Sequence, residues 1–149
     1  MTETILNRDC IRACNELLRG EISAVETYGT AIDKFKDEPE VATLIQIRDG
    51  HRASVQTLTE NVRSMGGQPD HDSGAWGTFA NAVQSASALF GENAALTSLI
   101  NGEEHGIHEY ESALNSDDVM TECKAMIRSE LLPRLLENKA TLEQLRDRV

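Results

Sequence analysis

Two stretches of the sequence decide the fold: GEISAVETYGTAI at Gly20–Ile32 and GEEHGIHEYESAL at Gly102–Leu114. Both begin with Gly-Glu, and both place a tyrosine seven residues after that glutamate. A second pair, HRASVQTL at His51–Leu58 and NKATLEQL at Asn138–Leu145, recurs in the same order. Chance similarity between amphipathic helices is the alternative, but a shared Glu-x6-Tyr is not a generic helical pattern. The chain is therefore predicted to contain two helical hairpins of similar design.

Turn-forming residues mark where these helices begin and end. Pro39 suits the first turn of a helix, and Gly66-Gly67 is a strong signal for the end of that helix. Pro133 lacks a backbone N–H, so we expect it to remove one hydrogen bond and kink the last helix. Four long helices are predicted, at about residues 5–35, 39–65, 92–114 and 118 to near the C-terminus.

These lengths predict an all-α fold without strands. Helices of about 30 residues are roughly 45 Å long, and short loops make consecutive helices antiparallel neighbours. We expect one antiparallel four-helix-bundle domain over residues 1–149, with pseudo-symmetric hairpins at about 5–66 and 92–149. The long crossover at about 67–91, with a possible short helix at about 76–90, would carry the chain from one end of the bundle to the other.

Composition narrows the classes of function and partner. The sequence has 14 basic and 25 acidic residues and a net charge of −11, which argues against nucleic acids and anionic membranes as partners. We find no apolar run long enough to span a membrane and no apolar signal segment. Three cysteines fit a reduced compartment better than a disulfide scaffold. We therefore expect a cytoplasmic protein, and the long amphipathic helices favour a homodimer.

Each predicted helix carries polar residues on the face that its apolar spacing marks as buried. Steps of three and four residues define that face in a helix, and the same steps select the polar positions. These residues are Glu21 and Tyr28 on the first helix, Arg48 and His51 on the second, Glu103 and Tyr110 on the third, and Asn138 on the fourth.

Two buried glutamates that face each other need a positive group between them. Burying an unpaired charge costs several kcal/mol, and two carboxylates would otherwise repel. A guanidinium always carries a positive charge and can donate several hydrogen bonds to carboxylates. The leading prediction is therefore that Arg48 bridges Glu21 and Glu103. The alternative is a single metal ion held by Glu21, His51 and Glu103, because zinc accepts such ligands with one open position.

The paired Glu-x6-Tyr helices resemble those of the ferritin-like carboxylate proteins. The resemblance implies a metal-ligating glutamate on the first and third helices and a tyrosine that bonds to the site carboxylates. It also implies Glu-x-x-His on the second and fourth helices, where this sequence reads Arg48-x-x-His51 and Leu135-x-x-Asn138. Of the six ligands that the resemblance implies, three remain: Glu21, His51 and Glu103.

The chain also resembles a bacterial family of ferritin-like four-helix bundles that carries a domain-of-unknown-function label. The resembling features are Gly66-Gly67-x-Pro69, Ser73-Gly74-x-x-Gly77 and the two Glu-x6-Tyr helices. An arginine at or near Arg48 to Arg52 on the second helix also fits, and the resemblance covers nearly the whole chain. This resemblance implies a fold and no particular reaction.

Together these observations favour a non-catalytic structural or interaction protein with a degenerate di-metal site and no cofactor. The alternative is a metal-binding carboxylate protein of oxidase or metal-handling type, with one zinc, iron or manganese ion or a di-iron pair. No substrate and no protein partner follows from the residues. Cys10 and Cys14 share one helical face, which suits a thiol pair, but buried cysteine in a core is commoner.

Overall fold

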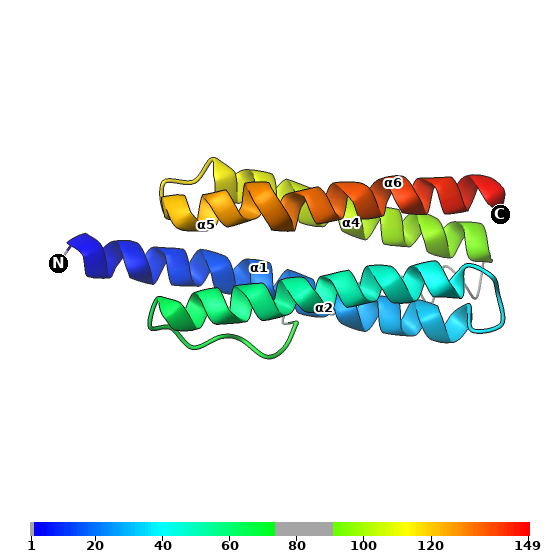
Figure 1. Ribbon diagram of the computed structural model, residues 1–149, viewed down its shortest axis with the longest axis horizontal. Coiled ribbons are helices and arrows are strands. Elements are labelled where there is room, and N and C mark those ends of the chain that lie inside the picture. Colours follow the sequence, from blue (N-terminus) through cyan, green and yellow to red (C-terminus); the bar gives the residue numbers. More distant parts are fainter. Residues whose placement is uncertain (1, 74–90) are drawn as a thin grey trace.

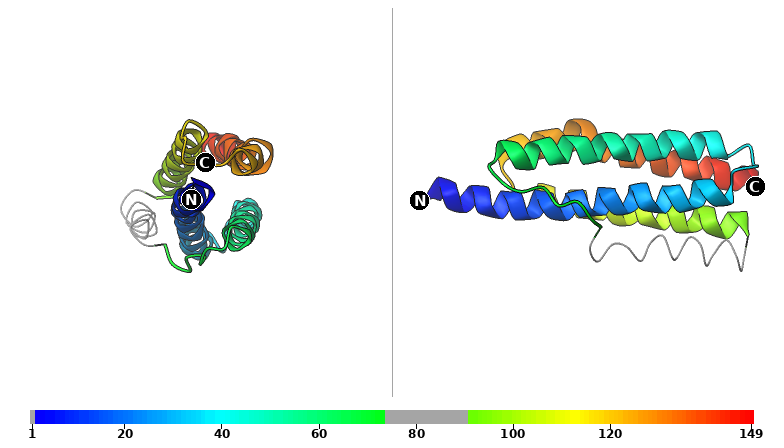
Figure 2. Two further views of the ribbon diagram at one scale, coloured as in Figure 1. Left: turned by 90° about the vertical axis from the view of Figure 1, so that its left-hand side faces the viewer. Right: turned by 90° about the horizontal axis from the view of Figure 1, so that it is seen from below.

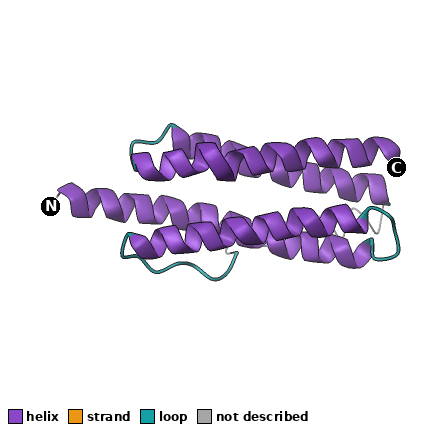
Figure 3. Ribbon diagram, viewed as in Figure 1, coloured by secondary structure: helices purple, strands orange, loops and turns teal. Residues whose placement is uncertain are grey.

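The computed structural model describes residues 2–73 and 91–149, and all regular structure in these two ranges is helical (Figures 1 and 3). The long helices are α1 (Thr2–Lys34), α2 (Val41–Ser64), α4 (Glu92–Leu114) and a last one made of α5 (Thr121–Met126), η2 (Ile127–Leu131) and α6 (Leu132–Arg148). The predicted all-helical class is confirmed, whereas the expected short helix at about 76–90 falls outside the described residues. Among the described helices, none offers an apolar stretch that could cross a membrane.

The helices are arranged as two hairpins whose axes run along one common direction (Figures 1 and 2). α1 packs mainly on α2, α4 packs mainly on α6, and contacts between α1 and α4 join the two hairpins. α2 ends at one end of the bundle and α4 begins at the other, so these two helices run in the same direction (Figure 1). The antiparallel neighbours α1 and α4 are therefore the helices that bring the two Glu-x6-Tyr stretches together.

Apolar side chains fill the interior in two clusters. Tyr28 belongs to one cluster, together with Phe35 and Leu44. Tyr110 belongs to the other, which also contains Leu58. Full burial of an aliphatic or aromatic side chain contributes about 1.5–3 kcal/mol, so these clusters supply most of the driving force for folding. Of the polar residues predicted from the apolar faces, all but Arg48 are buried in this interior.

The Gly66-Gly67 signal ends α2 as predicted, and the backbone shows why glycine stands there. Gly66 has a φ of +84°, a conformation that side chains with a Cβ rarely adopt. A Cβ on Gly67 would lie 2.7 Å from Cγ2 of Ile11. The start of the same helix differs from the prediction, because residues 35–40 form turns and α2 begins at Val41, two residues after Pro39.

The irregularity expected near Pro133 takes the form of a π-helical turn, η2. The N–H of Leu132 donates to the carbonyl of Ile127, an i to i+5 bond that accommodates one extra residue. Residues spaced four apart rotate gradually away from the inward face of an α-helix, because four residues make more than one full turn. An extra residue in one turn of the helix corrects this rotation. Such steps of four separate the buried positions Cys123, Ile127, Leu131 and Leu135.

Candidate functional site

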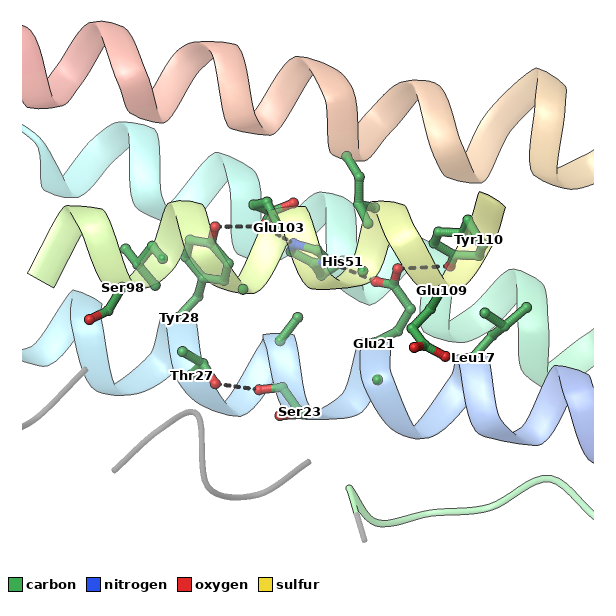
Figure 4. A pocket seen from close by; sticks show the side chains of 16 residues that line it. Leu17, Glu21, Ser23, Thr27, Tyr28, His51, Ser98, Glu103, Glu109 and Tyr110 are labelled. Atoms are coloured by element: carbon green, nitrogen blue, oxygen red, sulfur yellow. Dashed lines mark hydrogen bonds and ion pairs between the residues drawn. The ribbon is translucent and has the colours of Figure 1, made fainter. Parts of the chain in front are cut away.

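The middle of the bundle holds a buried group of polar side chains, which we call the mid-bundle centre. Glu21 from α1 and Glu103 from α4 are each 3% exposed, and the imidazole of His51 from α2 lies between them (Figure 4). The Nδ1 atom of His51 is 2.6 Å from Oε2 of Glu21, and its Nε2 atom is 2.7 Å from Oε2 of Glu103. The centre comprises Glu21, Tyr28, His51, Glu103, Tyr110 and Asn138.

The tyrosine of each repeat binds the glutamate of the other. The hydroxyl of Tyr28 donates to Oε2 of Glu103 at 2.6 Å, and that of Tyr110 donates to Oε1 of Glu21 at 2.8 Å. The two residues of each Glu-x6-Tyr motif lie two turns apart on one helical face. On antiparallel neighbours this spacing sets each tyrosine opposite the other helix's glutamate. The repeat seen in the sequence thus produces a reciprocal pair of hydrogen bonds.

Asn138 of α6 occupies the position that corresponds to His51 in the second hairpin. Its Nδ2 atom donates to Oε1 of Glu103 at 3.2 Å and lies 3.4 Å from Nε2 of His51. A side-chain amide offers N–H donors but carries no charge. The centre therefore contains one ring that can become a cation, and every carboxylate oxygen of the two glutamates accepts a hydrogen bond.

The hydrogen-bond geometry assigns His51 as an imidazolium. A neutral imidazole has one N–H donor, whereas both ring nitrogens here face carboxylate oxygens, which only accept. Burial opposes a charge on His51, but attraction to Glu103 and Glu21 outweighs burial and raises the pKa of His51 to about 10. The Tyr28 ring stacks on the imidazole with centroids 5.3 Å apart, which places an aromatic face beside the cation.

Both tyrosines remain hydrogen-bond donors. Burial, together with the charges of the neighbouring carboxylates, raises the pKa of Tyr28 and the pKa of Tyr110 well above the usual value. Protonated phenols, an imidazolium and an amide therefore surround the two carboxylates.

Arg48 does not bridge the two glutamates, so that prediction is wrong. Its side chain is 22% exposed, and its guanidinium lies 3.3 Å from Oδ1 of Asp49. The reason is the step that follows Leu44: the buried face of α2 continues at Ile47, three residues later, and not at Arg48, four residues later. His51 occupies the place that Arg48 was expected to fill.

The three predicted metal ligands do not converge on one point. The ring of His51 separates Glu21 from Glu103, so an ion could contact all three only after the ring left its place and both bonds broke. This triad is not among the groups of described residues whose candidate ligand atoms all lie within 4.8 Å of one another. Those groups are Cys10, Cys14 and Cys123, and Glu38, Glu40 and Glu92. The single-ion site stays a prediction that this arrangement does not favour.

A cavity between α1 and α4 reaches the mid-bundle centre (Figure 4). The small residues Gly20, Ala24 and Gly102 line part of it, and the carboxylates of Glu21 and Glu103 line another part. Small residues keep the two backbones close and leave room beside the carboxylates.

A second buried cluster, which we call the sulfur cluster, adds to the predicted cysteine pair a third cysteine that the sequence analysis did not connect with it. It brings together Cys10 and Cys14 of α1 and Cys123 of α5, which are at most 2% exposed and form no disulfide. The Sγ atom of Cys123 is 3.4 Å from that of Cys10 and 3.7 Å from that of Cys14. Hydrogen bonds from Cys10 and Cys14 lower the pKa of Cys123, although burial acts in the opposite sense. Hydrogen bonds within the same cluster, together with burial, raise the pKa of Cys10 and the pKa of Cys14.

A signal for this cluster was present in the sequence. All three cysteines precede the mid-bundle residue of their own helix, and the first and fourth helices of such a bundle run in the same direction. The cysteines therefore belong to one end of the bundle. A single sequence does not reveal how far each helix is shifted along the bundle axis. The contact between Cys123 and Cys10 could therefore not be predicted from it.

Comparison with known proteins matches the chain to a protein family. A family model described as "Domain of unknown function (DUF2383)" matches residues 9–116, which is more than half of the chain. The matched range includes both Glu-x6-Tyr stretches and His51, and it ends before Cys123 and Asn138. Searches of curated proteins and of solved structures give no match.

Proposed function

We propose a function from the residues themselves, because the chain belongs to the DUF2383 family, which is described as a domain of unknown function. We infer that the protein is a ferritin-like bundle in which an internal ion network replaces a di-metal site. Its role is then that of a structural or interaction protein and not of an oxidase. One observation carries this proposal: His51 is bonded through both ring nitrogens to carboxylates from two different helices.

The arrangement of the helices supports the ferritin-like part of the proposal. Two hairpins are joined by a connection between opposite ends of the bundle, as in bundles with one long crossover. The Glu-x6-Tyr pairs occupy the two helices that join the hairpins, α1 and α4. The polar side chains also project inward near the middle of the helices, where that fold places its metal ligands.

The donor set does not fit a pair of metal ions. A di-metal carboxylate site in this fold takes about four carboxylates and two histidines. The mid-bundle centre offers two carboxylates and one imidazole, and Asn138 turns an N–H donor toward Glu103. All four carboxylate oxygens are already occupied as hydrogen-bond acceptors. In this proposal the positive charge that the carboxylates require comes from the chain itself.

The network gives the bundle a defined alignment. It connects α1, α2, α4 and α6 through groups that all lose their partners if one helix slides or rotates. An unpaired buried charge costs several kcal/mol, so misaligned packings of these amphipathic helices are disfavoured. A bundle with a fixed alignment presents a constant surface, which suits a structural or interaction protein.

Metal content and histidine protonation test the proposal. The purified full chain, before and after anaerobic incubation with ferrous iron or manganese(II), should hold well below one ion per chain at the mid-bundle centre. Nitrogen NMR of His51 at neutral pH should show both ring nitrogens protonated. One ion per chain that is lost in Glu21→Gln and Glu103→Gln, but retained in Cys123→Ser, would instead establish the metal-binding alternative.

The homodimer and the cytoplasmic location remain predictions of the same proposal. Sedimentation velocity of the full chain tests the dimer, because a bundle of this length gives clearly different coefficients as monomer and as dimer. Net charge of −11 keeps nucleic acids outside the proposed set of partners.

A further inference from the structure

We propose that Cys10, Cys14 and Cys123 form a binding site for a soft, thiophilic metal ion, copper(I). The inference goes beyond the proposed function, because the sulfur cluster shares no residue with the mid-bundle centre. It rests on the convergence of three sulfur atoms, on the donors that surround them and on their burial.

The three sulfur atoms already have nearly the spacing of metal ligands. The Sγ atoms of Cys10 and Cys14 lie 3.4 and 3.7 Å from that of Cys123, and all three lie within 4.8 Å of one another. Three thiolates, each at about 2.3 Å from a shared ion, would be roughly 3.8–4.0 Å apart. The two distances to Cys123 would therefore have to lengthen by only a few tenths of an ångström to admit an ion between α1 and α5.

N–H groups point at each of the three sulfur atoms. The side-chain amide of Asn61 donates to Cys123 at 3.1 Å and to Cys14 at 3.3 Å, and the backbone N–H of Met120 donates to Cys10 at 3.5 Å. Such bonds stabilise negative charge on sulfur and orient it, as the outer partners of metal ligands do. These N–H groups would thus stabilise the negative charge that each sulfur atom takes on when an ion replaces its proton.

The composition of the site selects a soft ion. Its three candidate ligands are all sulfur, and their side chains are almost fully buried among apolar residues. Ions that prefer oxygen ligands and bound water find neither in this set. Zinc in structural sites takes four ligands, whereas thiolates and thioethers also select copper(I), which three sulfur atoms can hold. Three methionines, Met65, Met120 and Met126, pack against the same core.

Binding replaces thiol protons by the ion. The S–H bonds of the thiols break and their protons pass to water. A copper–sulfur bond then forms at each of the three sulfur atoms. Neither copper(I) nor sulfur changes its oxidation state, so no oxidant or reductant takes part. Affinity is therefore expected to increase with pH over the range in which the thiols lose their protons.

An anaerobic competition experiment tests the site. The reduced full chain is titrated with copper(I) that is buffered by a coloured chelator, and thiolate-to-copper absorption and thiol alkylation are followed. We expect one copper per chain, with all three cysteines protected from alkylation. Cys123→Ser and Cys10→Ser should each lower the affinity by at least about 100-fold, and Asn61→Leu by about 10-fold.

A matched control separates loss of a ligand from loss of packing. Ile127→Val lies in the same core, four residues after Cys123, and carries no sulfur, so its affinity should equal that of the original chain. Circular dichroism shows whether each variant is folded. The two serine variants lie on different helices, so a loss of affinity in both cannot come from local damage to one helix.

Three results would overturn the proposal. They are failure to compete with the chelator, copper binding that is unchanged in both serine variants, and zinc that stays bound when equimolar copper(I) is present. None of these results would contradict the proposal for the mid-bundle centre, which is tested separately with Glu21→Gln and Glu103→Gln.

Discussion

The bundle buries two clusters of polar groups, and the two are balanced in different ways. In the mid-bundle centre, His51 supplies a positive charge and every carboxylate oxygen has a hydrogen-bond donor. In the sulfur cluster three like groups face one another, and among the described residues only N–H dipoles offset them. Burial is the same in both, so the balance of donors, acceptors and charges indicates which cluster needs a ligand.

The largest expected effect comes from removing the cation of the mid-bundle centre. His51→Ala leaves two buried carboxylates without their shared partner, and breaking a buried ion pair in this way costs about 3–5 kcal/mol. Urea denaturation measures the change. Arg48→Ala is the control, because its half-buried ion pair with Asp49 is worth at most about 1 kcal/mol. Equal losses in the two variants would contradict the assignment of His51 as the bridging cation.

The pH dependence of stability tests the same cation without removing it. Folding raises the pKa of His51 from 6.5 to about 10, so the folded state binds the proton more tightly. Its contribution is complete below pH 6.5, decreases as the pH rises and is lost above about pH 10. We expect the stability difference between the original chain and His51→Gln to shrink over this range in urea titrations. A difference independent of pH would mean that His51 is neutral in the folded state.

The next effect is that of the two tyrosine hydroxyls. Tyr28→Phe and Tyr110→Phe each remove a donor to a buried carboxylate, which costs about 1.5–3 kcal/mol. Thermal or urea denaturation of the two single variants and the double variant measures the losses. Because both tyrosines belong to one network, the double variant should deviate from the sum of the single variants. Strict additivity would show two independent bonds.

The smallest expected effect lies in the sulfur cluster of the ion-free chain. Asn61→Ala removes the amide that donates to Cys14 and Cys123, and a bond of this kind contributes about 0.5–1.5 kcal/mol. Reduced, metal-free protein is compared by urea denaturation. A loss as large as that of Tyr28→Phe would show that the chain balances the sulfur cluster as tightly as the mid-bundle centre, and the contrast between the two would disappear.

Much of the fold could be predicted because strong local signals mark it. α4 spans Glu92–Leu114, the range expected from its punctuation, and Gly66-Gly67 ends α2. The start of α2 was misplaced because Pro39 fits both a helix's first turn and the turn that precedes a helix. The short helix expected at about 76–90 lies outside the described residues and stays a prediction.

The mid-bundle centre was predictable to the extent that the repeat encodes it. Glu21, Tyr28, Glu103 and Tyr110 occupy corresponding positions, so any packing that buries one pair buries the other. Arg48 was misassigned because steps of three and four are equally compatible with an apolar face. Only contact with the neighbouring helices decides between Ile47 and Arg48, and it favours the side chain that has no charge to desolvate.

The π-helical turn at Ile127–Leu131 sets the rotational phase of the last helix. Its additional residue allows the segment before it and the segment after it to present Cys123 and Asn138 to one interior. Deleting a residue there would restore a regular α-helical repeat and swing the upstream segment by about 100°. A single-residue deletion at this point would thus disconnect the third thiol from its partners while leaving every amino acid of both clusters unchanged.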